Sequence, residues 1–143
     1  MIAIRNLTRQ KLPLAKIIKI AKMVLKEEGI RKEPFLSIVF VGKKRMKTLN
    51  KTYRGRDHAT DVLAFYSPSS WKKINDLGEI FICLDTVKKN APLFGYSFEK
   101  ELFNSIIHGV LHLLGYNDER KEERKKMIKK QKHYLELFLT KYG

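Results

Sequence analysis

The segment from residue 98 to residue 114 constrains the fold more than any other part of the sequence. Apolar residues recur in it at helical spacing and on more than one side, which is typical of a buried helix. Ser97 precedes it as a potential N-cap, and Gly115 follows it as a potential C-terminal stop. We therefore predict a buried helix whose core side chains are Leu102, Phe103, Ile106, Ile107, Val110, Leu111 and Leu114.

Helical and extended patterns alternate along the rest of the chain. They predict helices at residues 14–28, 43–52, 85–93 and 119–141, and strands at residues 35–41, 60–65 and 79–84. No internal repeat or linker rich in Gly and Pro interrupts them, so we expect residues 1–143 to form a single domain. A chain of 143 residues is long enough to bury a core of its own. The mixture of elements predicts a layered α/β or α+β fold.

The sequence shows no pattern that predicts secretion or membrane insertion. Cys83 is the only cysteine, which excludes a disulfide framework, and it lies in an apolar run where a buried side chain is expected. No apolar run approaches the length of a membrane span, and the first residues lack the pattern of a signal peptide. We therefore expect a cytoplasmic protein with no membrane partner.

The charge of the chain is the first indication of a partner. Lys and Arg number 30 against 15 Asp and Glu, so the formal net charge is +15. Such an excess on a small domain favours a polyanion, and nucleic acid before a membrane. The alternative is a solvated, lysine-rich surface like that of proteins from hot environments. That bias, however, raises the number of charges of both signs.

Two histidines in the apolar helix form a potential metal site. His108 and His112 are four residues apart, so a helix places both rings on one face, where they can bind one metal ion, most often zinc. Gly115 allows a turn after the helix, and Asp118 can return towards the histidines as a third ligand. Three protein ligands leave a position open for water, as in catalytic zinc sites. The alternative is that either histidine is a hydrogen-bonded core residue.

The spacing of this segment also resembles that of the metzincin peptidases, H-E-x-x-H-x-x-G-x-x-H. A peptidase of that kind needs Glu directly after its first histidine as the general base. Gly109 occupies that position here and can accept no proton. Peptide hydrolysis by that mechanism is therefore not supported.

Three motifs together identify a family resemblance. Residues 108–116 match H-G-x-L-H-L-x-G-Y, and residues 77–82 match L-G-D/E-I-x-I. Asn50, Tyr53 and Arg54 match N-x-x-Y/F-R, followed by T-D-V-L-S/A-F at residues 60–65. The chain thus resembles the YbeY family of bacterial metal-dependent endoribonucleases. That family usually ends its helix motif with Asp-His, where this chain has Asn117 and Asp118.

The resemblance implies a fold, an activity and a cellular role. The fold is a zincin-like domain in which a small, mostly parallel sheet packs against helices, one of them the metal-binding helix. The activity is cleavage of single-stranded RNA in the maturation of ribosomal RNA, especially the 3′ end of 16S rRNA, and in ribosome quality control. The partners are ribosomal RNA and the small ribosomal subunit, and we expect a monomer with one Zn²⁺.

The resemblance also assigns site residues. His108, His112 and Asp118 are the expected metal ligands, and Arg54 corresponds to the invariant arginine of the family, which we expect to bind phosphate and stabilise the transition state. Without the motif, a surface ion pair of Arg54 with Asp57 or Asp61 would be the simpler interpretation. No general base is evident. The expected RNA-binding stretch contains no acid among its cations, which are Lys43, Lys44, Arg45, Lys47, Lys51, Arg54 and Arg56.

Two other functions remain open from the sequence. One is hydrolysis of a different substrate, such as a peptide, by the same metal site. Gly109 and the basic charge argue against it. The other is a ribosome-associated RNA-binding module with a structural metal. Three ligands rather than four, and the adjoining Arg54, argue against that.

Overall fold

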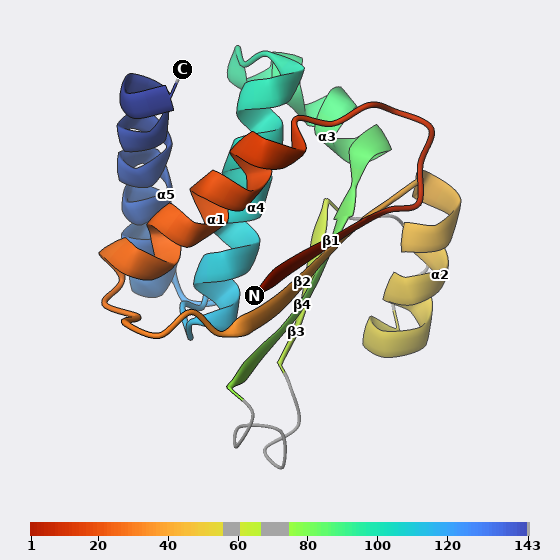
Figure 1. Ribbon diagram of the computed structural model, residues 1–143. Helices are drawn as coiled ribbons and strands as arrows, with labels where there is room; N and C mark the ends of the chain where they lie inside the picture. The colour runs from red at the N-terminus through yellow and green to blue at the C-terminus, as the bar shows by residue number, and fades with distance from the viewer. Residues whose placement is uncertain (56–60, 67–74, 143) are drawn as a thin grey trace.

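A four-stranded sheet organises the chain. In a computed structural model, which describes residues 1–55, 61–66 and 75–142, the strands are β1 (Ile2–Asn6), β2 (Phe35–Val41), β3 (Val62–Tyr66) and β4 (Asp76–Cys83). Their order is β1-β2-β4-β3, and β3 alone is antiparallel to its neighbour (Figure 1). The mostly parallel sheet expected from the family resemblance is confirmed.

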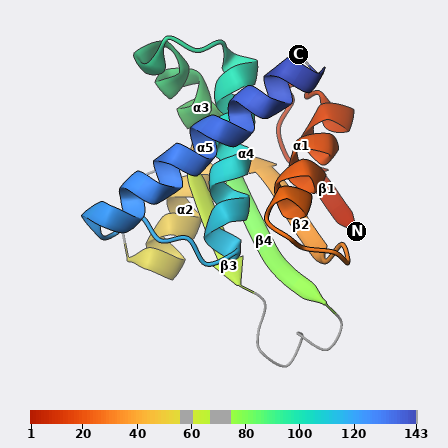
Figure 2. The same cartoon turned by 90° about the vertical axis from the view of Figure 1, so that its left-hand side faces the viewer.

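Helices cover both faces of the sheet. On one face lie α1 (Leu14–Glu27) and α4 (Phe98–Leu113), and α5 (Lys121–Tyr142) crosses over them (Figure 2). On the other face lies α2 (Lys43–Arg54), while α3 (Leu84–Asn90) and the short 3₁₀-helix η2 (Ala91–Phe94) connect β4 to α4. None of the helices in the part of the chain that the structure describes is long and apolar enough to cross a bilayer.

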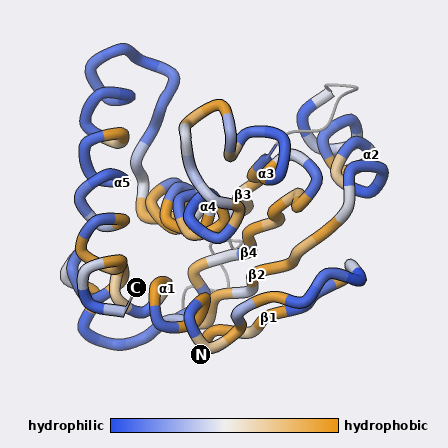
Figure 3. The backbone as a smooth tube through the Cα atoms, turned by 90° about the horizontal axis from the view of Figure 1, so that it is seen from above, coloured by the Kyte–Doolittle hydropathy of each residue, from blue (hydrophilic) through white to orange (hydrophobic). Residues whose placement is uncertain are grey.

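The predicted buried helix, α4, lies at the centre of the main core. Leu102, Ile106, Val110 and Leu111 are fully buried there, between the sheet, α1 and α5. Leu114, which we predicted in the core, follows the end of α4 and is only partly buried. In Figure 3 hydrophobic and hydrophilic colours alternate along α4, the hydrophobic colour predominates along β2, and most of α5 and α2 is in the hydrophilic colour. The side chain of Ser97 accepts a hydrogen bond from the backbone N–H of Lys100 at 3.1 Å, which confirms the predicted N-cap.

A smaller apolar cluster lies between the sheet and α2. It contains Met46 from α2 together with Val39, Val41, Leu63 and Cys83 from the strands. The predicted burial of Cys83 is confirmed, since none of its surface is exposed. Because α2 contributes so little apolar surface, most of its side chains remain available for contact with solvent or a partner.

The main departures from the predicted elements are at β1, at the helix predicted for residues 85–93 and at the start of β4. Strand β1 was not predicted, because its five residues are a strand only through parallel pairing with β2, more than thirty residues away. The predicted helix at 85–93 is instead α3 followed by η2, where Pro92 near the start of η2 interrupts the α-helical pattern. Strand β4 begins three residues earlier than predicted, at Asp76. Thr60, the first residue of the strand predicted at residues 60–65, lies outside the described residues, and β3 begins at Val62.

Gly109 brings α4 unusually close to the sheet. A Cβ atom at this position would lie 2.7 Å from Ile80 Cγ2 and 3.3 Å from Val62 Cγ1. Ile80 is fully buried in β4 and has no room to move away. The glycine is therefore required by packing, and His108 and His112, on either side of this contact, are held against strands β3 and β4.

We predict that Gly109→Ala destabilises the protein by about 1–3 kcal/mol, because the new methyl group overpacks a rigid contact. Alanine stabilises a helix relative to glycine by up to about 1 kcal/mol. The cost of the packing clash must therefore exceed this gain in helix stability. Urea unfolding measures the difference. As a control, Gly42→Ala places its Cβ at an ordinary 3.6 Å from Asp85 Oδ2 and should cost much less. Equal stability of Gly109→Ala and the parent would show that the close contact is not a packing constraint.

Candidate active site

The two histidines of α4 point to a common position. The Nε2 atoms of His108 and His112 are 3.0 Å apart, and the ring planes meet at 76°. Both rings are half-buried, with 26% of each side chain exposed. The helical spacing predicted that the rings share one face of a helix, and the structure confirms this.

A turn after α4 brings Asp118 to the same position. Gly115 has a φ of +104°, a conformation that glycine adopts without strain, and the backbone N–H of Tyr116 then donates to the carbonyl of Leu111 at 3.0 Å. The Tyr116 hydroxyl donates to Glu28 Oε1 at 2.6 Å, which ties the turn to the end of α1. The chain reverses here, as we predicted for Gly115.

Glu28 is held as a carboxylate at this anchor. Its burial raises the pKa, but hydrogen bonds from Tyr116, Tyr134 and Lys130 outweigh that effect and lower the pKa below its ordinary value. Lys130 Nζ donates at 3.1 Å, and the Tyr134 hydroxyl donates to the same carboxylate oxygen. One ionised side chain thus joins α1, the turn and α5, and so fixes the segment that carries Asp118.

The three ligand atoms fit one small cation. Asp118 Oδ2 lies 3.8 Å from Nε2 of His108 and 3.6 Å from Nε2 of His112. The point equidistant from the three atoms is about 2 Å from each, the length of a zinc bond to nitrogen or oxygen. Among the described residues, these three are the only such group of potential ligands. Two imidazoles and a carboxylate are also a donor set that zinc accepts in catalytic sites.

Neighbouring side chains hold Asp118 in place without using its carboxylate. Asn117 Oδ1 accepts from the backbone N–H of Glu119 at 2.8 Å, so Asn117 stabilises the turn. Arg124 Nε donates to the backbone carbonyl of Asp118 at 3.0 Å. Helix α5 begins only at Lys121, and the carboxylate of Asp118 faces the histidines.

The surroundings of His112 favour its neutral form. Burial lowers its pKa below the ordinary value, and the neighbouring His108 lowers it further, while Asp118 partly opposes both effects. Neutral imidazole is the form that binds a metal ion, so the site need not displace a proton from this ring at neutral pH.

A chain of hydrogen bonds on the far side of His108 selects its tautomer. Nδ1 of His108 lies 2.8 Å from Oε1 of Gln131. The amide nitrogen of Gln131 donates to Oδ1 of Asn104 at 3.2 Å. The amide nitrogen of Asn104 in turn donates to Oε1 of Glu101 at 3.1 Å. Because the Asn104 amide donates to Glu101, its oxygen faces Gln131 and orients the amide of that residue in turn. Gln131 then presents its oxygen to His108. Nδ1 must carry the proton, and Nε2 is left bare towards Asp118.

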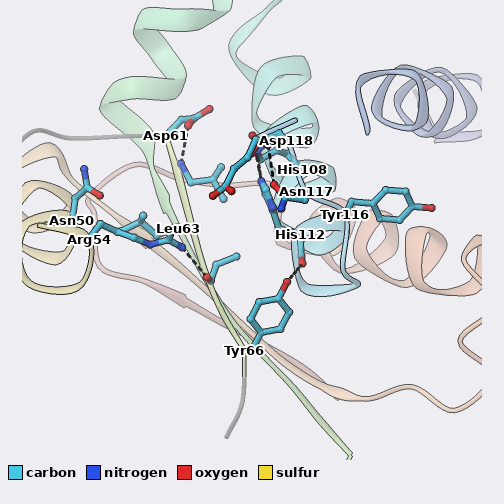
Figure 4. Close-up of a pocket in the computed structure, with 13 residues that line it drawn as sticks. Asn50, Arg54, Asp61, Leu63, Tyr66, His108, His112, Tyr116, Asn117 and Asp118 are labelled. Atoms are coloured by element: carbon cyan, nitrogen blue, oxygen red, sulfur yellow. Dashed lines mark hydrogen bonds and ion pairs between the residues drawn. The ribbon is translucent and has the colours of Figure 1, made fainter. Parts of the chain in front are cut away.

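A cleft joins this cluster to Arg54. Its volume is about 500 Å³, and α2, β3, α4 and the turn after α4 line it (Figure 4). Arg54 extends along β3, where its guanidinium donates to the carbonyl of Ala64 at 3.4 Å and lies 5.9 Å from the ring centre of Phe65. The hydroxyl of Tyr66 donates to the carbonyl of His112 at 2.7 Å and joins β3 to α4. Arg54 and the histidines, far apart in the sequence, thus line one cleft.

The other basic residues that we predicted to bind RNA lie on α2. Lys43, Lys47 and Lys51 follow one another at intervals of four, so they form a stripe on one face of the helix that leads to Arg54. Lys44 and Arg45 are also exposed on this helix. Arg56 lies outside the described residues, as does Asp57, a possible partner of Arg54.

The site contains residues that sequence reasoning missed. Gln131, Asn104 and Glu101 were not singled out, because no local pattern relates a glutamine of α5 to a histidine of α4. The spacing of Glu101, Asn104 and His108 places them on one face of a helix. This spacing was the signal in the sequence that could have indicated polar neighbours of His108. Glu119 also lines the cleft, as does Asp61, which the sequence suggested only as a possible ion-pair partner of Arg54.

The fold and the cleft define a class of protein: a small α/β protein with a potential three-ligand metal site on a helix that packs against the edge of a mostly parallel sheet. Comparison with known proteins specifies the class further. The model of the family described as Endoribonuclease YbeY matches residues 3–139. The chain therefore belongs to the Endoribonuclease YbeY family, a family of RNA-cleaving enzymes, which confirms the resemblance seen in the motifs.

Individual relatives agree with this assignment. An Endoribonuclease YbeY from Chlorobium phaeovibrioides is 40% identical over 95% of this chain and 89% of its own length. One from Staphylococcus carnosus is 39% identical over 82% of this chain and 78% of its own length. The solution structure of TM1509 from Thermotoga maritima matches with a TM-score of 0.72 at 33% identity, over 99% of this chain and 91% of that one.

We predict that Gln131→Met frees the ring of His108, because methionine fills the same space but offers no strong acceptor to Nδ1. Nitrogen-15 NMR of the metal-free protein should show His108 protonated at Nδ1 in the parent and as a mixture of tautomers in the variant. The other glutamine of the chain, Gln10, provides the control, and Gln10→Met should leave the His108 signals unchanged. A single Nδ1-protonated tautomer in both variants would contradict the role of Gln131.

Proposed function

We propose that this protein is a metal-dependent endoribonuclease that cleaves single-stranded RNA. The observation that carries the proposal is the convergence of His108, His112 and Asp118 within 4.8 Å of one another, in the same cleft as Arg54. Membership of the Endoribonuclease YbeY family and the net charge of +15 support RNA as the substrate.

In this proposal His108, His112 and Asp118 hold one divalent cation, with zinc as the first candidate. A cation bound there would polarise a phosphate oxygen and lower the pKa of a nucleophilic water or ribose hydroxyl. The hydrogen bond to Gln131 keeps His108 in the tautomer that presents Nε2 to the cation. The anchored turn keeps the carboxylate of Asp118 in place, so little order has to be created on binding.

Arg54 binds the phosphate of the substrate in this proposal. Its planar guanidinium can donate two hydrogen bonds to a phosphate and is charged at any physiological pH. The stripe of Lys43, Lys47 and Lys51, together with Lys44, Arg45 and Arg56, attracts the RNA backbone and leads it to Arg54. A cleft of about 500 Å³ has the dimensions of a small-molecule site, which suits an extended strand better than a duplex.

The cellular role follows from the family resemblance. We propose that a cytoplasmic monomer, formed by residues 1–143 as one domain, matures ribosomal RNA at the 3′ end of 16S rRNA and takes part in ribosome quality control with the small subunit. Against peptide hydrolysis, a side chain at Gly109 would meet Ile80 and Val62, so the peptidase general base has no space at this position.

Metal analysis and substrate incubation test the proposal. The purified protein is expected to contain close to one divalent metal ion per chain. It should cleave single-stranded ribosomal RNA, leave duplex RNA and casein intact, and lose activity with a chelator. Cleavage that continues after removal of all metal would overturn the metal dependence, and cleavage of casein alone would overturn the RNA substrate.

We predict that Asp118→Ala lowers zinc affinity by more than tenfold and lowers RNA cleavage with it, because one of three ligands is lost. Asp118→His should retain zinc, since imidazole is an equally suitable ligand. Asn117→Ala is the neighbouring control and should leave zinc affinity nearly unchanged. Competition with a zinc-sensitive dye measures all three. Tight zinc binding by Asp118→Ala would show that Asp118 is not a ligand.

We predict that Arg54→Lys binds zinc normally but cleaves RNA roughly 30- to 150-fold more slowly. Lysine keeps the charge but not the two-pronged geometry, and the loss of bidentate contact in the transition state corresponds to about 2–3 kcal/mol. Single-turnover cleavage measures the rate. Arg5→Lys on strand β1 is the control for the substitution itself. An Arg54→Lys variant as fast as the parent would return Arg54 to the surface ion pair considered above.

A further inference from the structure

A second cavity adjoins the cleft. This side pocket has a volume of about 360 Å³, and its walls come from η2 and the residues after it, from α4 and from α5. His108, Asp118 and Asp61 line both the cleft and the side pocket. A group bound in the side pocket is therefore next to whatever is bound at the histidines.

We propose that the side pocket binds the base of a nucleotide adjacent to the cleaved phosphate, and that it prefers a base with an exocyclic amino group. The inference rests on the proposed function, because it takes RNA as the substrate of the neighbouring site. Its volume lies within the range of small-ligand sites and so accommodates one base.

The apolar walls of the side pocket suit the faces of a base. Phe94, on η2, is 59% exposed, and Ile128, on α5, is 45% exposed, although both are large and apolar. Met127, which is buried, also lines this pocket. Single exposed apolar residues are common, but here two from different elements line one pocket beside a potential hydrolytic site. Proteins that bind single-stranded RNA stack its bases on exposed aromatic and apolar side chains in this way.

The polar group of the side pocket selects the edge of the base. Glu101 is only 3% exposed, and its Oε1 accepts from Asn104. Its Oε2 is buried and has no hydrogen-bond partner in the part of the chain that the structure describes. An acceptor without a donor in such a place is costly, and an amino group of a base would satisfy it. A carbonyl oxygen at the same position of the base would bring a second acceptor to Oε2 and leave it unsatisfied. Cytosine is therefore preferred over uracil.

The rim of the side pocket favours a nucleic-acid strand over a neutral ligand. Lys132, on α5, is exposed and lines the pocket, so its ammonium group can bind a phosphate that flanks the base. Lys129, one turn earlier, lines a different concavity of α5 together with Glu122 and Glu123. Lys132 and Lys129 thus lie one turn apart on the same helix, but only Lys132 lines the side pocket.

Binding of oligonucleotides without metal tests the proposal apart from catalysis. Fluorescein-labelled decamers of cytidine and of uridine have the same length and charge, and their anisotropy is measured in chelator at one fixed salt concentration. The parent should bind the cytidine decamer about tenfold more tightly, the order of discrimination of one good base contact. Glu101→Gln should remove or reverse this preference, because an amide can also donate to a carbonyl. Equal affinity of the parent for both decamers would overturn the base preference.

Surface variants keep the test independent of the buried Glu101. Phe94→Ala and Lys132→Ala should weaken binding of both decamers severalfold. Their controls are Leu93→Ala, an even more exposed neighbour of Phe94, and Lys129→Ala, and neither should change binding comparably. If Phe94→Ala behaves as Leu93→Ala does, the side pocket does not hold a base.

The result is distinguishable from failure of the proposed function. If metal-loaded protein cleaves mixed-sequence RNA but the decamers bind equally, only the side pocket is wrong. If the decamers differ and Phe94→Ala weakens the binding of both, while no RNA is cleaved, the base site stands and the endoribonuclease function is wrong.

Discussion

The contact of Gly109 with Ile80 is the constraint on which the site depends. It sets the distance between α4 and the sheet, since no side chain separates the helix from β4 at this point. With the helix that close, His108 and His112 face the cleft beside strand β3 rather than the core. The same glycine accounts for the absent peptidase base, because a larger residue here would displace the helix that carries both histidines.

The third member of the cluster depends on a different interaction, between segments that are distant in the sequence. Asp118 follows a turn whose Tyr116 is bound by Glu28, 88 residues away. Lys130 and Tyr134 bind the same carboxylate, so α1, the turn and α5 are fixed by one ionised group. Burial and charge cooperate here, because a carboxylate with three donors stays ionised even where solvent is largely excluded.

The sequence predicted what depends on local patterns and missed what depends on tertiary contacts. The helix at 98–114, its Ser97 cap and the shared face of His108 and His112 follow from helical periodicity, and each is confirmed. Strand β1 exists through pairing with β2 and was missed. Gln131 reaches His108 across 23 residues, and neither its type nor its neighbours indicated this contact. The motifs identified the family, but no motif could place Glu101 beside a second cavity.

The distribution of charge in the cleft differs from that of the protein as a whole. The protein carries +15 overall, and the exposed cations of α2 attract an RNA strand from a distance. The cleft itself is different: Asp61, Asp118 and Glu119 line it, against Arg54 as the one permanently charged cation among the described lining residues. Without a further positive charge, these carboxylates would oppose a phosphate close to the histidines. In the proposed function, a divalent cation held by His108, His112 and Asp118 would offset these negative charges where the phosphate must lie, and would thereby strengthen the contact of RNA with Arg54 and the histidines together.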